Sequence, residues 1–277
     1  AILPPKTELF EPHMLNGPNM NQIWTRFGPN ELIFFEYICA VRRFSTRQLF
    51  LLPHGNDYRS ESINIKPDIM ESIYSFEGRI PIPDAMEQMI PVNPRHGKWV
   101  KLFSDYPIIS DVLDGLEKDG KGYCHISRKD VFAEKDNARK AILVLLWGFP
   151  GGYRNSATHR NAVKSALEIA EEINDRNLTK PMFKAMMAKK GIGLSTLSKI
   201  LYFFGYKVEG NRALILDSRV RSSLKAFPDF KETTCNRAGS FEEYTSYVNR
   251  MTDIAGKMNG VTPDQLEYFL FRYDQKQ

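Results

Sequence analysis

The 277-residue chain has only three cysteines, Cys39, Cys124 and Cys235, which are scattered and odd in number. Such sparse usage is typical of a protein kept in a reducing compartment, so we expect a cytoplasmic location and no disulfide framework. No apolar stretch approaches the ~20 residues of a membrane span, and the first residues do not read as a signal peptide. We therefore expect neither a secreted nor a membrane-embedded protein.

Two kinds of cofactor site are also missing. No glycine-rich phosphate loop followed by Lys and Ser or Thr occurs, so we expect no nucleotide cofactor. His54, His96, His125 and His159 show no paired spacing, so we expect no metal site. Hydrophobic content of 42% and charged content of 26% are ordinary for a globular protein, which directs attention to local motifs rather than composition.

The chain divides into two regions of different character. Residues 1–130 mix short apolar runs with frequent prolines, which suits loops, short elements and some strands. Residues 131–277 contain apolar positions at helical spacing and two capping boxes, at Ser240–Glu243 and Thr262–Gln265. We expect a mostly α protein, or α+β where the N-terminal half supplies strands, with a helical domain over 131–277.

The segment 179–224 carries the strongest pattern. Thr179 is suited to N-cap a helix, Gly191-Ile192-Gly193 interrupts that helix, and a second helix starts near Ser195. Two glycines allow positive φ and the close approach of another backbone. The free N–H groups of this hairpin, with the hydroxyls of Ser195 and Thr196, are expected to form an anion site. A hairpin that only packs is the alternative.

Positive charge is concentrated around this hairpin. Residues 176–231 contain twelve Lys or Arg and three acidic residues, whereas the whole chain has a net charge of +5. Such a patch is expected of a nucleic-acid binder, although a solvated basic face is the alternative. Lys199 lies roughly 200° around the helix from Leu197, so it is predicted to point away from the core. With Lys189 and Lys190 it is a candidate phosphate contact.

Beyond the hairpin, the apolar run Leu214–Leu216 ends in Asp217 at the start of another expected helix, Ser218–Phe227. This combination resembles the helix-hairpin-helix DNA glycosylase superfamily over about the last 140 residues, and it is closest to the 8-oxoguanine glycosylase (OGG) fold. The resemblance implies that Asp217 is the catalytic aspartate. It also assigns the grip on a DNA phosphate to four hairpin residues: Lys190, Gly191, Gly193 and Ser195.

The chemistry of such an enzyme independently needs a carboxylate. Breaking the bond between a base and deoxyribose builds positive charge on the sugar, which a nearby carboxylate can stabilise while it orients or deprotonates the attacking water. The alternative is that Asp217 simply N-caps the helix that follows it. Both roles are compatible, because a cap position fixes the carboxylate in space.

One position departs from part of the superfamily. Members that also cut the strand through a Schiff base carry a lysine two positions after the second hairpin glycine, where this chain has Ser195. Lys199 comes one turn later and is expected to face elsewhere. We therefore expect a monofunctional glycosylase without lyase activity, which leaves an abasic site. Three cysteines also exclude the four-cysteine iron–sulfur cluster of some relatives, so we expect no cofactor.

A loop rich in Gly and Pro, residues 148–156, lies between two expected helices at 137–147 and 157–173. In this superfamily the corresponding loop inserts side chains into the duplex where the target base has left the stack. Tyr153, Arg154 and Asn155 provide a ring, a guanidinium and an amide, and are candidate duplex-wedge or base-pocket residues. A tight interhelix loop without such a role is the alternative.

The excised base is suggested only by resemblance. OGG-like sequences without the lysine and with a long, divergent N-terminal half resemble the bacteriophage replication-inhibition DNA glycosylase group of prokaryotic antiviral proteins. That resemblance implies removal of α-glucosylated hydroxymethylcytosine from phage DNA, with residues from 1–130 lining a roomy pocket. The alternatives are a repair glycosylase for 8-oxoguanine, a non-catalytic DNA-binding protein and a binder of structured RNA. For an enzyme we expect a monomer acting on duplex DNA that contains a modified base.

Overall fold

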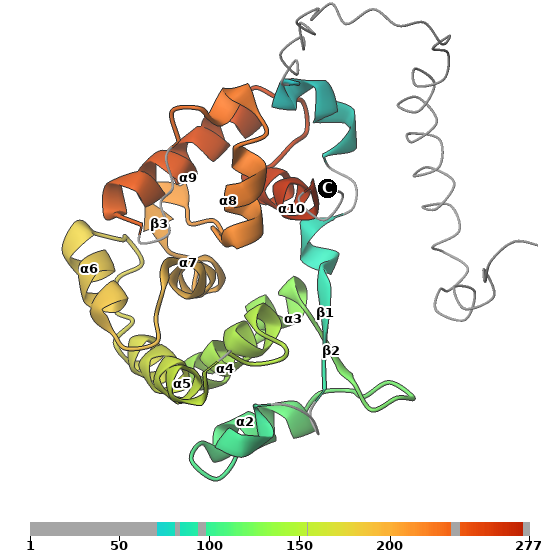
Figure 1. Cartoon of the computed structure of the whole chain (residues 1–277), viewed down its shortest axis with the longest axis vertical. Coiled ribbons are helices and arrows are strands. Elements are labelled where there is room, and N and C mark those ends of the chain that lie inside the picture. The colour runs from blue at the N-terminus through green and yellow to red at the C-terminus, as the bar shows by residue number, and fades with distance from the viewer. Residues whose placement is uncertain (1–70, 81–83, 94–97, 154, 234–238, 274–277) are drawn as a thin grey trace, which may run out of the picture. The chain divides into compact units, whose positions relative to one another are not determined.

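The computed structural model describes residues 71–80, 84–93, 98–153, 155–233 and 239–273, all of which belong to the unit formed by residues 66–277 (Figure 1). The first 70 residues, where part of the expected base pocket lies, are outside the described residues. In chain order the elements are η1 (Ile73–Arg79), η2 (Ala85–Glu87), β1 (Met89–Val92), η3 (Val100–Leu102), α2 (Pro107–Asp114), β2 (Cys124–Ser127), α3 (Arg128–Ala133), α4 (Asn137–Gly148), α5 (Ser156–Glu171), α6 (Lys180–Ala188), α7 (Leu194–Phe203), β3 (Lys207–Val208), β4 (Asn211–Arg212), α8 (Ser218–Leu224), η4 (Pro228–Phe230), α9 (Phe241–Gly256) and α10 (Pro263–Tyr273).

The fold is mostly helical, as predicted, and α7 lies at its centre. Every residue from Thr196 to Phe203 is at most 4% exposed. Figure 1 shows this helix nearly end-on in the middle of the other helices. A helix that is apolar on nearly all sides is stable only when it is surrounded by other elements. The hairpin that precedes α7 is thereby anchored in the core of the protein.

Two short antiparallel sheets account for the strands. β1 pairs with β2 in a register that aligns Met89 with Ser127, and β3 pairs with β4. At the end of β2 the side chain of Ser127 forms a capping box with Asp130 and starts α3. The backbone N–H of Arg128 donates to the carbonyl of Gln88 at 3.2 Å. The first sheet therefore fixes where Arg128 enters the core.

The described residues before position 131 pack into the same hydrophobic core as the helices that follow. Trp99, Ile109 and Ile126 are completely buried in that core. No helix within the described residues has the length and apolar content needed to cross a bilayer.

The predicted helix signals are confirmed in several places. The hydroxyl of Thr179 accepts from the N–H of Met182 at 3.4 Å, and the capping boxes at Ser240–Glu243 and Thr262–Gln265 both form. One boundary was wrong, because α8 ends at Leu224 and not at 227. Pro228 disfavours helical backbone in the residue before it, so the last predicted turn does not form.

Candidate active site

The glycine hairpin lies between α6 and α7 and packs tightly against α5. Gly191 has φ +81°, and a Cβ there would lie 2.5 Å from the backbone nitrogen of Ala162. Only glycine satisfies both the conformation and the close approach. Gly193 differs, because its φ is −114° and a Cβ there would meet nothing within 4 Å. Of the two glycines that allow positive φ, Gly191 adopts it and Gly193 does not.

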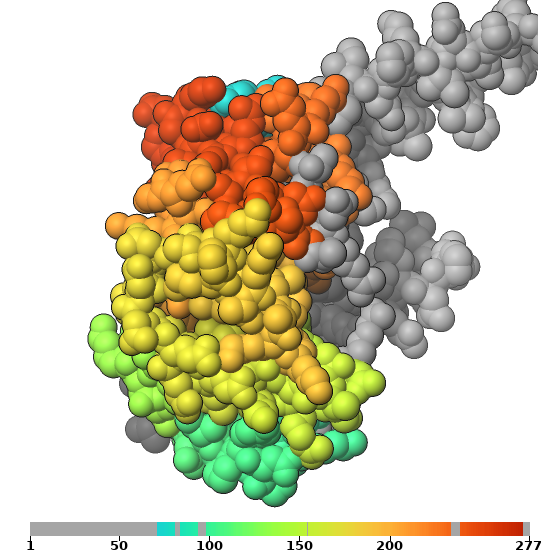
Figure 2. Space-filling model, turned by 90° about the vertical axis from the view of Figure 1, so that its left-hand side faces the viewer, coloured from blue at the N-terminus to red at the C-terminus, as the bar shows by residue number. Residues whose placement is uncertain are grey.

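Gly193 is the exposed N-cap of α7 and makes no side-chain capping bond. The Thr196 N–H donates to the Gly193 carbonyl at 2.9 Å, so the N–H groups of Leu194 and Ser195 remain as the candidates for contact with an external anion. Lys190 is exposed beside them. Lys189 is instead engaged within the protein, since its Nζ lies 3.1 Å from Glu168 and 3.0 Å from Glu172 of α5. Figure 2 shows the face that α5 and α6 form, in yellow-green and yellow.

The hydroxyls expected to join this anion site are used elsewhere. Thr196 is buried, and its Oγ1 lies 3.0 Å from the hydroxyl of Tyr153. Ser195 is half-buried, and its Oγ accepts a hydrogen bond from Lys199 Nζ at 3.1 Å. The backbone of the hairpin, more than these side chains, is therefore the part that faces outward.

Asp217 is held at the end of an extended segment whose backbone is bound by side chains. The N–H of Leu216 donates to the Ser198 hydroxyl at 3.0 Å. The carbonyls of Leu214 and Ile215 accept at 2.8 Å from two tyrosine hydroxyls of α9, those of Tyr244 and Tyr247. Residues of α7 and α9 therefore determine where the aspartate emerges.

The carboxylate itself is fixed by the start of α8. Asp217 is the N-cap, as predicted, and its Oδ1 accepts from the N–H groups of Arg219 and Val220, each at 3.0 Å. Its Oδ2 lies 3.7 Å from Lys199 Nζ. Backbone N–H groups therefore hold one oxygen of Asp217 in place. The side chain is 13% exposed, so the carboxylate still reaches the surface.

The position of the Lys199 side chain differs from the one predicted from helical spacing. The prediction that it points away from the core is wrong, because α7 is surrounded by protein on its far side as well. The Lys199 side chain is 5% exposed and its Nζ lies 5.4 Å from the centre of the Phe149 ring. Gly148 makes room for it, since a Cβ there would lie 2.7 Å from Lys199 Cδ. Burial lowers the pKa of this lysine, and the charge of Asp217 opposes the shift.

Tyr153, in the loop after α4, is held by contacts within the protein. The Tyr153 ring stacks on Phe149 at 4.3 Å between centroids and lies 5.4 Å from the ring of His159. Burial lowers the pKa of His159 to about 4, so this imidazole is neutral at physiological pH. Asn155 N-caps α5, and Arg154 lies outside the described residues.

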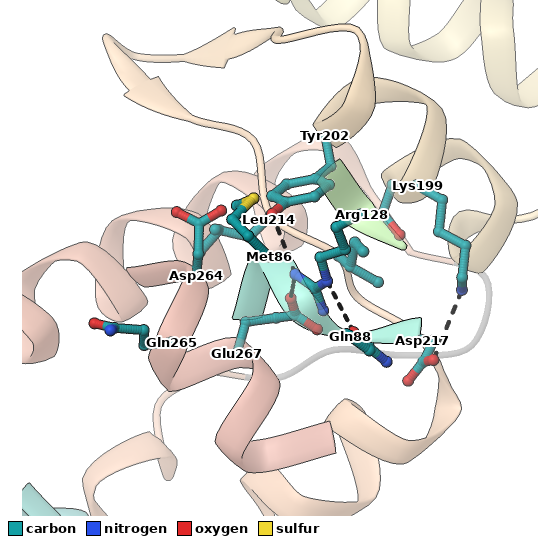
Figure 3. Close-up of polar contacts among 12 residues, drawn as sticks. Met86, Gln88, Arg128, Lys199, Tyr202, Leu214, Asp217, Asp264, Gln265 and Glu267 are labelled. Atoms are coloured by element: carbon teal, nitrogen blue, oxygen red, sulfur yellow. Dashed lines mark hydrogen bonds and ion pairs between the residues drawn. The ribbon is translucent and has the colours of Figure 1, made fainter. Parts of the chain in front are cut away.

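A second buried ion pair, which the sequence reasoning missed, lies beside the first (Figure 3). Arg128 of α3 donates through Nη1 to Glu267 Oε2 of α10 at 2.7 Å, and through Nε to Gln88 Oε1 at 2.8 Å. Both charged side chains are completely buried. Three aromatic rings surround the guanidinium with centroids 5.2 to 5.5 Å from Cζ: Trp147, Tyr202 and Tyr268.

The site therefore brings the exposed start of α7 together with a partly exposed carboxylate and buried charges, which Lys199 links through its contacts with Ser195 and Asp217. Within the described residues, no group of three or more His, Cys, Asp or Glu is arranged to hold a metal ion. The chemistry available from these side chains is that of a positioned carboxylate and a buried amine.

A protein-family model described as "Putative 8-oxoguanine DNA glycosylase OGG-like protein" matches residues 84–271. Among curated proteins and among solved structures, none matched the chain. The matched span includes the hairpin, Asp217, Lys199 and the Arg128–Glu267 pair. Because it covers more than half of the 277 residues, the chain belongs to this OGG-like DNA glycosylase family.

Proposed function

We propose that this protein hydrolyses the N-glycosidic bond of a modified base flipped out of duplex DNA, with Asp217 as the catalytic carboxylate. The observation that carries the proposal is the position of Asp217, whose carboxylate is locked through Oδ1, reaches the surface and follows the glycine hairpin in the chain. An electrostatic stabiliser must be fixed before charge develops, because reorganisation during the reaction would reduce its effect.

The step assigned to Asp217 follows from the charge that appears on the sugar. As the bond between C1′ and the base breaks, the base leaves with the bonding electrons and positive charge develops on the sugar. The Asp217 carboxylate stabilises that charge and orients a water, which adds to C1′ and passes a proton through the carboxylate to the departing base. The products are the free base and an abasic site.

The hairpin is proposed to hold the DNA backbone next to this carboxylate. The N–H groups of the first turn of α7 and the exposed Lys190 would contact a phosphate. Gly193 would lie at the contact, since it is exposed and carries no side chain to separate the backbone from the phosphate. Lys189 remains a candidate only if DNA competes with Glu168 and Glu172 for its ammonium.

The decisive test is Asp217→Asn. Asparagine caps helices as well as aspartate does, so the variant should keep its stability and its affinity for DNA. We expect formation of abasic sites to fall by about 10²- to 10³-fold, the range seen when one preorganised electrostatic group is removed. Alkaline cleavage of modified duplexes measures the product. Equal product from both forms would refute the catalytic role, and product from neither form would favour a non-catalytic DNA-binding protein.

The base is proposed from resemblance alone. We propose α-glucosylated hydroxymethylcytosine in phage DNA, in an antiviral role, with 8-oxoguanine as the alternative that the family description names. A parallel assay on glucosylated phage DNA and on a duplex with one 8-oxoguanine separates the two. Release of only the oxidised purine would replace the antiviral proposal with base-excision repair.

A second candidate function is strand cleavage, and the position of Lys199 favours it. One of the two reasons for expecting a monofunctional enzyme was that Lys199 faces elsewhere, and this reason is removed by its contact with Asp217. The lysine amine reaches back to the Ser195 hydroxyl, which occupies the sequence position of the lysine in strand-cleaving members. A buried amine with a lowered pKa is neutral more often and so more nucleophilic.

In that reaction the Lys199 amine would add to the aldehyde of an abasic site and lose water to form an imine. Elimination of the 3′-phosphate would then cut the strand. Borohydride reduces the imine to a stable adduct, so trapping with abasic duplex DNA tests the step. An adduct that disappears in Lys199→Met would establish the lyase activity. Absence of an adduct in the parent protein, with abasic sites still formed, would support the monofunctional alternative.

A further inference from the structure

The two buried ion pairs form one cluster of four charged side chains, and they come from four different elements. Arg128 begins α3, Lys199 lies on α7, Asp217 caps α8 and Glu267 lies on α10. Figure 3 shows the two pairs side by side, with Gln88 between Glu267 and Asp217. Fully ionised, the cluster contains two positive and two negative charges, so the charge of each group affects the others.

The cluster has little solvent to screen those effects. Arg128 and Glu267 are completely buried, and the Lys199 side chain is 5% exposed. Interactions between charges are much stronger in such an environment than at a surface, because the effective dielectric constant is lower. Adding or removing one proton in this cluster should therefore change the proton affinity of its neighbours.

The Arg128–Glu267 pair is also incompletely satisfied. Arg128 Nη2 and Glu267 Oε1 are buried without a hydrogen-bond partner. A buried charged group without its full set of partners is costly, so such a pair is a weak device for stability alone. Its free carboxylate oxygen leaves Glu267 able to take up a proton.

The charged groups that act on Lys199 come from three other elements. Asp217 lies at the start of α8, Arg128 on α3 and Glu267 on α10, where Asp264 acts in turn on Glu267. The loop after α4 presents the Phe149 ring to Lys199. Burial favours the neutral form of the Glu267 carboxyl and raises its pKa.

We propose that Arg128 and Glu267 are positioning residues that set whether the amine of Lys199 holds its proton. A negative Glu267 holds the proton on Lys199, while Arg128 opposes that effect. When Glu267 becomes neutral, Lys199 releases its proton more easily. The consequence for catalysis rests on the proposed function, whereas the control of proton occupancy does not.

Burial supports the direction of this coupling. It raises the pKa of Glu267 to about 7, against the pull of Arg128, and it lowers the pKa of Lys199. The two groups therefore titrate closer to each other, and nearer to neutral pH, than a free carboxyl and a free amine. A coupled pair of this kind loses protons in two macroscopic steps that belong to the pair.

The test measures the Lys199 titration directly in the full chain. Lysine labelled with ¹³C at Cε gives an NMR shift that follows the charge of each amine, and loss of a signal in Lys199→Met assigns it. In the parent protein we expect the Lys199 signal to shift in two steps, one of them at the titration of Glu267. If the Lys199 signal shifts in a single step and does not change near neutral pH, the proposal is overturned. This result needs no variant at position 267.

Two variants then give opposite shifts. Glu267→Gln removes a negative neighbour and should lower the pKa of Lys199 by about 1 unit. Adding Arg128→Met removes a positive neighbour and should return the pKa toward the parent value. Removing the unpaired Arg128 can also restore a destabilised fold, so the titrations are compared only where urea denaturation shows every variant to be folded, and the shift and its return then report charge. An unchanged Lys199 titration in Glu267→Gln would refute the proposal.

Activity provides the matched functional measurement. If the protein forms abasic sites or trapped adducts, adducts should form down to a lower pH in Glu267→Gln than in the parent protein. In the double variant the pH profile should return to that of the parent. If the titration shifts as expected but no DNA is processed, the proposed function fails and the electrostatic coupling stands. If Glu267→Gln changes which base is released and leaves the pH profile unchanged, the pair reads the base and does not control the lysine.

Discussion

The two ion pairs of the site differ in geometry although they share one cluster. Arg128 and Glu267 are 2.7 Å apart and completely enclosed, whereas Lys199 and Asp217 are 3.7 Å apart and the carboxylate reaches solvent. Arg128 also donates to Gln88 and Tyr202. The tight pair is thus held by the fold, while the loose pair is held mainly through the capping bonds of Asp217.

This difference separates two roles for buried charge. A charge that is enclosed on all sides can act only through its field, because no substrate reaches it. A charge pair with a longer separation and partial exposure can exchange partners, as a catalytic carboxylate and amine must. The two pairs therefore differ in access to solvent: the Arg128–Glu267 pair is enclosed, and the Lys199–Asp217 pair reaches solvent only through its carboxylate.

The two pairs should differ most in the stability that is lost when the positive charge of each is removed. Arg128→Ala leaves Glu267 buried without a partner and should destabilise the protein by about 3–5 kcal/mol. Lys199→Met removes a charge that burial already disfavours, so its stability should change by less than about 1 kcal/mol. Urea denaturation measures both values. Equal losses of stability would mean that the two pairs are structurally equivalent. The control is the double variant Arg128→Met with Glu267→Met, which removes both charges and leaves neither buried without a partner.

The second test uses pH. The pKa of Glu267 is raised in the folded state from 4.5 to about 7, so the folded protein binds its proton more tightly. Stability from this group is complete below pH 4.5 and is lost as pH rises through 7, by on the order of 3 kcal/mol. Comparison of unfolding free energies at pH 5 and pH 8 measures the loss. The slope should be smaller in Glu267→Gln, and an unchanged slope would show that Glu267 is ionised throughout.

The smallest expected change in stability comes from Gly148→Ala, which disturbs only the loose pair. The new Cβ would lie 2.7 Å from Lys199 Cδ, so the flexible lysine must move. Stability should change by about 0.5 kcal/mol or less. Trapped adduct should fall by about 10- to 100-fold if the amine must be positioned closely. Gly151→Ala is the control, since that glycine is exposed and has open space around it. Equal adduct from both variants would contradict a precise role for Lys199.

Local signals in the sequence were sufficient for much of the helical part. Thr179 and the two capping boxes marked helix starts, and the apolar run before Asp217 placed that residue correctly at a helix N-cap. These features depend on neighbouring residues only, and the spacing of a helix or a cap is visible in the chain. The location of Gly191 at a close approach was also predictable, because no other residue tolerates it.

Contacts between distant segments were not predictable in the same way. Lys199 was misplaced because helical spacing gives a direction around α7 but does not reveal that protein surrounds the helix. Glu267 carried a detectable signal, since it lies three residues before Leu270 and directly after Leu266, on the apolar side of its helix. Its partner Arg128 lies 139 residues away, and no local pattern connects the two.

The three hydroxyls that bind the backbone before Asp217 have a consequence for how this activity could arise or be transferred. Ser198 lies on α7, which precedes Asp217 in the chain. Tyr244 and Tyr247 lie on α9, which follows Asp217. A fragment with the hairpin and Asp217 but without α9 would lack two of these three anchors. Grafting the motif onto another scaffold should therefore transfer DNA affinity more readily than turnover.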